Sequence, residues 1–162
     1  MNWNNQGIVR GALVLVLSSA HLAWAGPAGE LLSLKIATPV EAIRDSNLAL
    51  QVTMTNRSPQ PMTIIKSNPG CDFSADVRDA AGSPVPLTTI GAELSHCANR
   101  LTLGRWIRVT LKPGQSTDET YPIDLYYGLP RPGVYRVQLS RTDRSGVGQA
   151  AQSNEVVLNL AE

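Results

Sequence analysis

Short segments in which apolar residues occupy every second position recur along this chain, and this alternation constrains the fold more than any other feature. In residues 48–55, for example, Leu, Leu, Val and Met alternate with small or polar residues. A two-residue period places successive side chains on opposite faces of a β-strand, so one face of each strand can be buried. We expect further strands at 32–36, 62–66, 73–77, 107–111, 121–125, 135–139 and 156–160.

Clusters of Pro, Gly, Asn and Ser separate these segments and predict turns. One of them, Asn56-Arg57-Ser58, also matches the N-glycosylation sequon, but we interpret it as a turn that ends a strand. No stretch has a helical period. About eight short strands with regular turns predict an all-β protein, an immunoglobulin-like antiparallel β-sandwich of seven to nine strands.

Residues 1–25 are predicted to be a cleaved signal peptide, and residues 26–162 to form the sandwich domain. Arg10 precedes an apolar run, and Ala23-Trp24-Ala25 fits a small-x-small cleavage site. A retained membrane anchor is the alternative, but a run of about 15 residues is shorter than the roughly 20 that a spanning helix needs. We therefore expect a periplasmic or secreted protein with no membrane attachment after cleavage.

Cleavage would remove Arg10, and the formal net charge of +1 would fall to zero. A neutral domain gives no electrostatic reason to bind nucleic acid, so we expect no nucleic-acid partner. His21 would leave as well, which makes His96 the one histidine of the predicted domain.

Cys71 and Cys97 both follow the predicted cleavage site, and we expect them to form a disulfide in an oxidising compartment. The bond would close a loop of about 26 residues and contribute roughly 3.5 kcal/mol in the chain-entropy model. It would brace an irregular segment, 85–105, and long irregular segments are commonly functional. The alternatives are a redox pair, which usually has a shorter spacing, or metal ligands.

Two catalytic or metal-binding hypotheses depend on His96. With Cys71 and Asp72 it could form part of a metal site, but the spacing of a structural zinc site is missing. With Glu93 and Ser95 it could form a nucleophilic group, but these neighbours are too local to count as evidence. We therefore expect no metal, no cofactor and no catalytic residue.

The densest basic and aromatic group of the sequence is a candidate interface, because Trp and Arg are enriched in binding hot spots. The tyrosine pair at 126–127 is a second candidate, although both groups could instead pack against the sheets. The candidate interface residues are Arg100, Arg105, Trp106, Arg108, Tyr126 and Tyr127.

The segment Leu129-Pro-Arg-Pro-Gly133-Val-Tyr135 resembles the corner before strand F of immunoglobulin and fibronectin type III domains. In those domains a tyrosine hydroxyl bonds back to the nearby backbone. The resemblance implies that Leu129, Gly133 and Tyr135 form a structural tyrosine corner.

A longer stretch, about 48–140, is similar to the bacterial BsuPI-type proteinase inhibitor family, which has an immunoglobulin-like fold. The likeness rests on Val52-Thr-Met-Thr-Asn56, Pro61-Met-Thr-Ile64, Asp72-Phe73, Val77-Arg-Asp-Ala-Ala-Gly82, Thr110-Leu-Lys-Pro-Gly-Gln115 and the Leu129–Tyr135 corner. The export signal, the cysteine pair and the segment 85–105 depart from the family pattern. The resemblance implies the fold, and no inhibitory residue is carried over.

Three functional hypotheses follow. The first is a non-catalytic exported binding or accessory domain with an unknown protein partner. The second is a proteinase inhibitor that presents the disulfide-braced segment to an extracytoplasmic protease. The third is an enzyme that uses carboxylates, whose separation a sequence does not show.

Overall fold

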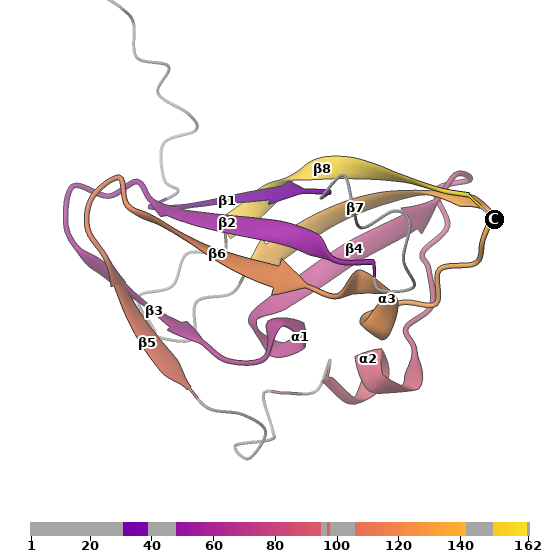
Figure 1. Cartoon of the computed structure of the whole chain (residues 1–162), viewed down its shortest axis with the longest axis horizontal. Helices are drawn as coiled ribbons and strands as arrows, with labels where there is room; N and C mark the ends of the chain where they lie inside the picture. Colours follow the sequence, from indigo (N-terminus) through magenta and orange to yellow (C-terminus); the bar gives the residue numbers. More distant parts are fainter. Residues whose placement is uncertain (1–30, 39–47, 95–96, 98–105, 142–150, 162) are drawn as a thin grey trace, which may run out of the picture.

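The computed structural model describes residues 31–38, 48–94, 97, 106–141 and 151–161. The predicted signal peptide, Ser95, His96, Arg100 and Arg105 lie outside the described residues. Eight strands form antiparallel sheets, so the predicted all-β sandwich is confirmed (Figure 1). The strands are β1 (Leu32–Ala37), β2 (Leu50–Asn56), β3 (Met62–Lys66), β4 (Phe73–Asp79), β5 (Ile107–Leu111), β6 (Ser116–Tyr121), β7 (Gly133–Arg141) and β8 (Ala151–Leu160).

The strands form two three-stranded sheets, ordered β1-β2-β6 and β4-β7-β8, and a two-stranded β3–β5 ribbon. The first sheet corresponds in order to strands A, B and E of an immunoglobulin-like sandwich, and the second to strands C, F and G. The ribbon extends from one end of the sandwich, at the lower left of Figure 1. Along the chain, β3 follows the strand that corresponds to B, and β5 precedes the strand that corresponds to E.

The core consists of the side chains that the alternation predicts to point inward. Strand β2 buries Leu50, Val52 and Met54, and β7 buries Val137 and Leu139 against them. At roughly 25 cal/mol per Å², such burial is the main term that stabilises the sandwich. The two-residue period therefore identifies the inner face of most strands correctly.

The expected strand at 121–125 is wrong. Strand β6 ends at Tyr121, and helix α3 (Ile123–Tyr126) follows Pro122, whose ring cannot donate to a sheet hydrogen bond. Strand β6 itself, Ser-Thr-Asp-Glu-Thr-Tyr, carries Thr117 and Glu119 at inward positions, so its sequence lacks the apolar alternation.

Two other short helices are also absent from the prediction: α1 (Pro69–Asp72) and α2 (Thr89–Leu94). All three are too short to produce a visible helical period. Helix α1 begins at the Asn68-Pro69-Gly70 turn, where the Asn68 side chain accepts a hydrogen bond from Gly70 N. Among the residues described, none of the helices has the length and apolar character to cross a membrane.

Asn56 lies at the corner between the first sheet and the ribbon and is fully buried. Its Nδ2 donates to Gln60 O at 2.8 Å and to Leu111 O at 2.9 Å, and its Oδ1 accepts from Ser58 N at 2.9 Å. Both amide hydrogens are therefore used inside the protein. This geometry supports the interpretation of the sequon as a turn, because a glycan needs an exposed amide.

The tyrosine corner contains a hydrogen bond from Tyr135 Oη to Pro130 O at 2.5 Å. A Cβ atom at Gly133 would lie 2.5 Å from Tyr135 Oη, so only glycine fits beneath the ring. Leu129 packs against the core. These three residues therefore have the arrangement that the resemblance implies.

Candidate functional site

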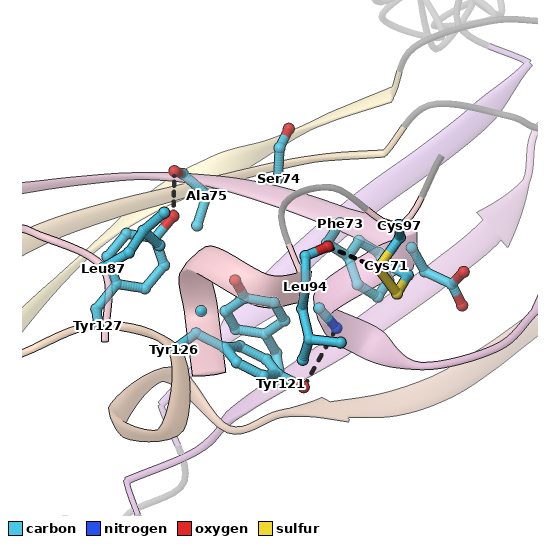
Figure 2. A pocket seen from close by; sticks show the side chains of 13 residues that line it. Cys71, Phe73, Ser74, Ala75, Leu87, Leu94, Cys97, Tyr121, Tyr126 and Tyr127 are labelled. Carbon is cyan, nitrogen blue, oxygen red and sulfur yellow. Dashed lines mark hydrogen bonds between the residues drawn. A yellow bond between two sulfur atoms is a disulfide. The ribbon is translucent and has the colours of Figure 1, made fainter. Parts of the chain in front are cut away.

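A pocket with aromatic walls lies between the start of β4, helix α2 and the segment that contains α3 (Figure 2). Its volume is about 410 Å³. The large side chains that line it are Phe73, Leu87, Leu94, Tyr121, Tyr126 and Tyr127. We call it the tyrosine pocket, and we call Tyr121, Tyr126 and Tyr127 the pocket tyrosines.

Two of the pocket tyrosines, Tyr126 and Tyr127, are fixed by hydrogen bonds as well as by packing. Tyr126 Oη donates to Asn68 Oδ1 at 3.1 Å and accepts from Gly70 N at 3.2 Å, which joins α3 to α1. Tyr127 Oη donates to Ala75 O of β4 at 2.7 Å. The walls are therefore held in place before any ligand binds.

Aromatic packing continues into the core. The rings of Phe73 and Tyr121 meet edge to face at 6.2 Å, and those of Tyr121 and Tyr126 at 5.1 Å. Burial raises the pKa of all three pocket tyrosines above the usual value of 10.0. The phenols are therefore neutral at physiological pH, and the aromatic walls of the pocket carry no charge.

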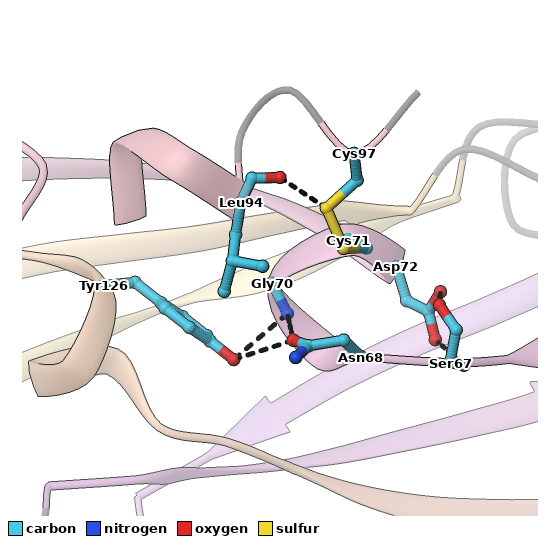
Figure 3. Close-up of a disulfide and its surroundings, with 8 residues drawn as sticks. All are labelled: Ser67, Asn68, Gly70, Cys71, Asp72, Leu94, Cys97 and Tyr126. Atoms are coloured by element: carbon cyan, nitrogen blue, oxygen red, sulfur yellow. Dashed lines mark hydrogen bonds between the residues drawn. A yellow bond between two sulfur atoms is a disulfide. The ribbon is translucent and has the colours of Figure 1, made fainter. Parts of the chain in front are cut away.

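The predicted disulfide between Cys71 and Cys97 is present, with 5.5 Å between the two Cα atoms (Figure 3). It joins α1 to the chain beyond α2, and both cysteines line the tyrosine pocket. Leu94, the last residue of α2, contacts Cys97 Sγ through its carbonyl oxygen. The disulfide thus fixes the wall of the pocket to which α2 contributes.

Contacts between α2 and α3 complete this wall. Thr88 donates from its backbone N to Tyr126 O at 3.0 Å and from Oγ1 to Leu125 O at 2.6 Å. A Cβ atom at Gly91 would lie 2.1 Å from Tyr126 O. Only glycine therefore permits this close approach of the two helices.

The structure separates the predicted interface residues. Tyr126 is only 3% exposed and Tyr127 is half-buried, and both line the tyrosine pocket. Trp106, 47% exposed, immediately precedes β5, and Arg108 is its second residue, on the ribbon. They do not line the tyrosine pocket.

The metal hypothesis finds no support in the part of the chain described, where no group of three or more His, Cys, Asp or Glu side chains is placed to hold a metal ion. Both cysteines form the disulfide, so neither is a thiolate ligand. The Asp72 carboxylate accepts two hydrogen bonds, from Ser67 N and Ser67 Oγ, both at 2.6 Å. Its contacts are those of a structural residue that fixes α1.

Tyr127 also lines a second cavity, of about 480 Å³, on the side of Leu129 and Leu160. Thr88, Asp124 and Arg131 contribute to the same cavity. The alternating pattern predicted neither cavity, because both are formed by turns and short helices from distant parts of the chain.

No protein-family model matches the chain, and no curated protein matches it significantly. Among solved structures it is similar to a β-glucuronidase of Bacteroides uniformis, with a TM-score of 0.38 and 14% identity, over 79% of this chain and 13% of that one. It is also similar to Bacteroides uniformis β-glucuronidase 2 covalently bound to cyclophellitol-6-carboxylate aziridine, with a TM-score of 0.37, 14% identity and the same coverage, 79% and 13%. The chain spans a small part of these enzymes, and similarity at this level supports no statement about activity.

Proposed function

We propose that this chain is a non-catalytic, extracytoplasmic binding domain that takes an apolar or aromatic side chain of a protein partner into the tyrosine pocket. The observation that carries the proposal is the preformed apolar wall of that pocket. Ligand sites are typically concave and mostly apolar, with few polar groups. The disulfide supports the extracytoplasmic location, because such bonds persist in oxidising compartments.

The pocket is prepared for binding in two ways. The hydroxyl groups of Tyr126 and Tyr127 are already occupied by Asn68 and Ala75, so an apolar ligand would leave neither without a partner. The disulfide and the α2–α3 contacts hold the walls, which lowers the entropy lost on binding. A buried Leu or Phe side chain contributes about 1.5–3 kcal/mol, or roughly 10- to 150-fold in affinity.

A peptide-display library screened against the oxidised protein tests the proposal, with Leu87→Asp as the pocket variant. Leu87 lines the pocket and is 42% exposed, while Val134, on the outer face of β7, is 43% exposed and serves as the matched control. Selected peptides should bind Leu87→Asp at least tenfold more weakly and Val134→Asp unchanged. Equal losses in both variants, or no enriched peptides, would refute the pocket as the binding site.

A proteinase inhibitor is the second candidate, because the disulfide braces Cys97 as that hypothesis requires. The resemblance to BsuPI-type inhibitors is a further reason to propose it. Titration against serine, cysteine and metalloproteases tests it. Stoichiometric inhibition that weakens in the double variant Cys71→Ser/Cys97→Ser, while the fold persists, would support a braced inhibitory loop; no inhibition at micromolar concentration would exclude the hypothesis for that panel.

A further inference from the structure

The far end of the β3–β5 ribbon is attached to the sandwich by side chains rather than by strand pairing. Among the described strands, β3 and β5 pair only with each other. Near the corner, Ile64 and Leu111 anchor the ribbon in the core. At the other end lie Ile65, Lys66, Ile107 and Arg108, which we call the ribbon tip.

Hydrogen bonds to two elements, β7 and β6, hold the ribbon tip. Arg141, at the end of β7, donates from Nη2 to Ile65 O. Lys66 Nζ donates to Asp118 O of β6 at 2.8 Å. The same ammonium lies 3.8 Å from Oε2 of Glu119, also on β6.

The Glu119 carboxyl group lacks part of its hydrogen bonding in this position. Its side chain points inward and is only 9% exposed. Within the described residues, Glu119 Oε2 is buried without a hydrogen-bond partner, and so is Nη1 of Arg141. A buried ionised oxygen that lacks a hydrogen bond costs free energy, and a weak ion pair at 3.8 Å offsets only part of that cost.

Charged and titratable groups from several elements surround Glu119, whereas its partner in β2 is the apolar Val52. Lys66 of β3 and Arg141 of β7 attract the carboxylate, whereas Asp72 of α1 repels it. The charge of Glu119 in turn raises the pKa of Tyr126 in α3. Two cations and two anions therefore meet at the end of the core nearest the ribbon.

We propose that Glu119 is a proton-controlled latch: the protonated carboxyl keeps the ribbon tip seated on the sandwich, and ionisation favours release of the tip into solvent. Release would hydrate the carboxylate and leave the anchors Ile64 and Leu111 in place. It would also change the exposure of Arg108, on the ribbon, and of Trp106, next to it, which are both predicted interface residues. The latch acts on the ribbon, and its test does not depend on the ligand proposed for the tyrosine pocket.

The direction in which pH shifts the ribbon tip follows from the burial of Glu119. Burial is the largest influence and raises the pKa of this carboxyl above 4.5, although the attraction of Lys66 lowers it. The seated state therefore binds the proton more tightly than a solvated state, and its advantage is lost as pH rises from 4.5 through the raised pKa. Each unit by which the two pKa values differ changes the ratio of the two states about tenfold.

The test uses the full chain with Trp3→Phe and Trp24→Phe, which leaves Trp106, beside the ribbon tip, as the one remaining tryptophan. Between pH 4.5 and 8 we expect the Trp106 emission to shift and its iodide quenching to rise. The amide resonances of Lys66 and Ile107 should titrate with the same midpoint. Glu119→Gln should abolish this transition, whereas Glu155→Gln, an exposed glutamate on β8, should leave it unchanged.

Lys66→Gln provides a second readout if Glu119→Gln does not fold. Because Lys66 lowers the pKa of Glu119, its removal should move the midpoint to higher pH. The proposal is overturned if the tip amides do not titrate in this range, if Glu119→Gln keeps the transition, or if the tip is released at acid rather than at neutral pH. A midpoint that falls in Lys66→Gln would also overturn it.

Discussion

Replacing Asn56 should destabilise the protein more than any substitution of an exposed polar residue. Asn56→Ala removes three side-chain hydrogen bonds, to Gln60 O, Leu111 O and Ser58 N. At about 0.5–1.5 kcal/mol for each bond, the loss is roughly 1.5–4.5 kcal/mol. Ser58 Oγ still donates to Gln60 O, so one of the three groups keeps a partner and we expect about 3 kcal/mol.

Asn56→Asp removes the side-chain donors without changing the size of the side chain, so it tests the hydrogen bonds apart from packing. Aspartate keeps the acceptor for Ser58 N, but it cannot donate to the Gln60 and Leu111 carbonyl groups. A buried carboxylate facing two carbonyl oxygens should cost more than alanine at neutral pH, and the difference should shrink as acid protonates the carboxyl.

Urea unfolding followed by circular dichroism measures both variants, with the exposed Asn159→Ala on β8 as the control. A loss of about 3 kcal/mol should lower Tm by roughly 10 °C in a domain of this size. The reasoning is refuted if Asn56→Ala costs less than about 1 kcal/mol, or if Asn56→Asp is the more stable of the two at pH 7.

Three further predictions concern the corner and the tyrosine pocket. Tyr135→Phe loses the hydrogen bond to Pro130 and should cost about 1–1.5 kcal/mol in urea unfolding, and no loss would mean that the bond contributes nothing. Gly91→Ala places a methyl group against the Tyr126 carbonyl oxygen and should cost about 1–3 kcal/mol and weaken peptide binding to the pocket. Gly128→Ala, whose added atom would lie 3.8 Å from its nearest neighbour, is the control that should change neither property. Finally, the pocket tyrosines have a raised pKa, so the stability that they confer should be lost as pH rises above 10.0, and their phenolate absorbance should appear only together with loss of near-ultraviolet dichroism.

The sequence predicted the strands whose inner faces are apolar and missed the elements that lack this pattern. Strands such as β2 and β7 follow the two-residue period because their side chains alternate between core and solvent. Strand β6 has Glu119 at an inward position, and no rule of alternation predicts a buried carboxylate. Its burial depends on Lys66 and Arg141, which come from distant segments.

The candidate site was only partly predictable for the same reason. The cysteine pair predicted the disulfide, because spacing and compartment favour it. The tyrosine pair drew attention to Tyr126 and Tyr127, but their orientation depends on Asn68 and Ala75, which are more than 50 positions away. No sequence pattern indicates that position 91 requires glycine, because the requirement comes from the close approach of the Tyr126 carbonyl oxygen.

Strands β1 and β8 lie at the edges of the two sheets, and the side chain of Asn154 on β8 acts as a substitute for a strand beside β1. Asn154 Oδ1 accepts from Ile36 N at 2.9 Å, and its Nδ2 donates to Ile36 O at 3.0 Å, as a backbone amide of a paired strand would. The register of β7 and β8 shifts close to this point, between Gln138 and Ser140, which interrupts the regular edge. Unprotected edges recruit strands of other molecules and lead to aggregation. A single amide side chain thus both joins the two sheets and occupies the Ile36 backbone groups with which a strand of another molecule would pair.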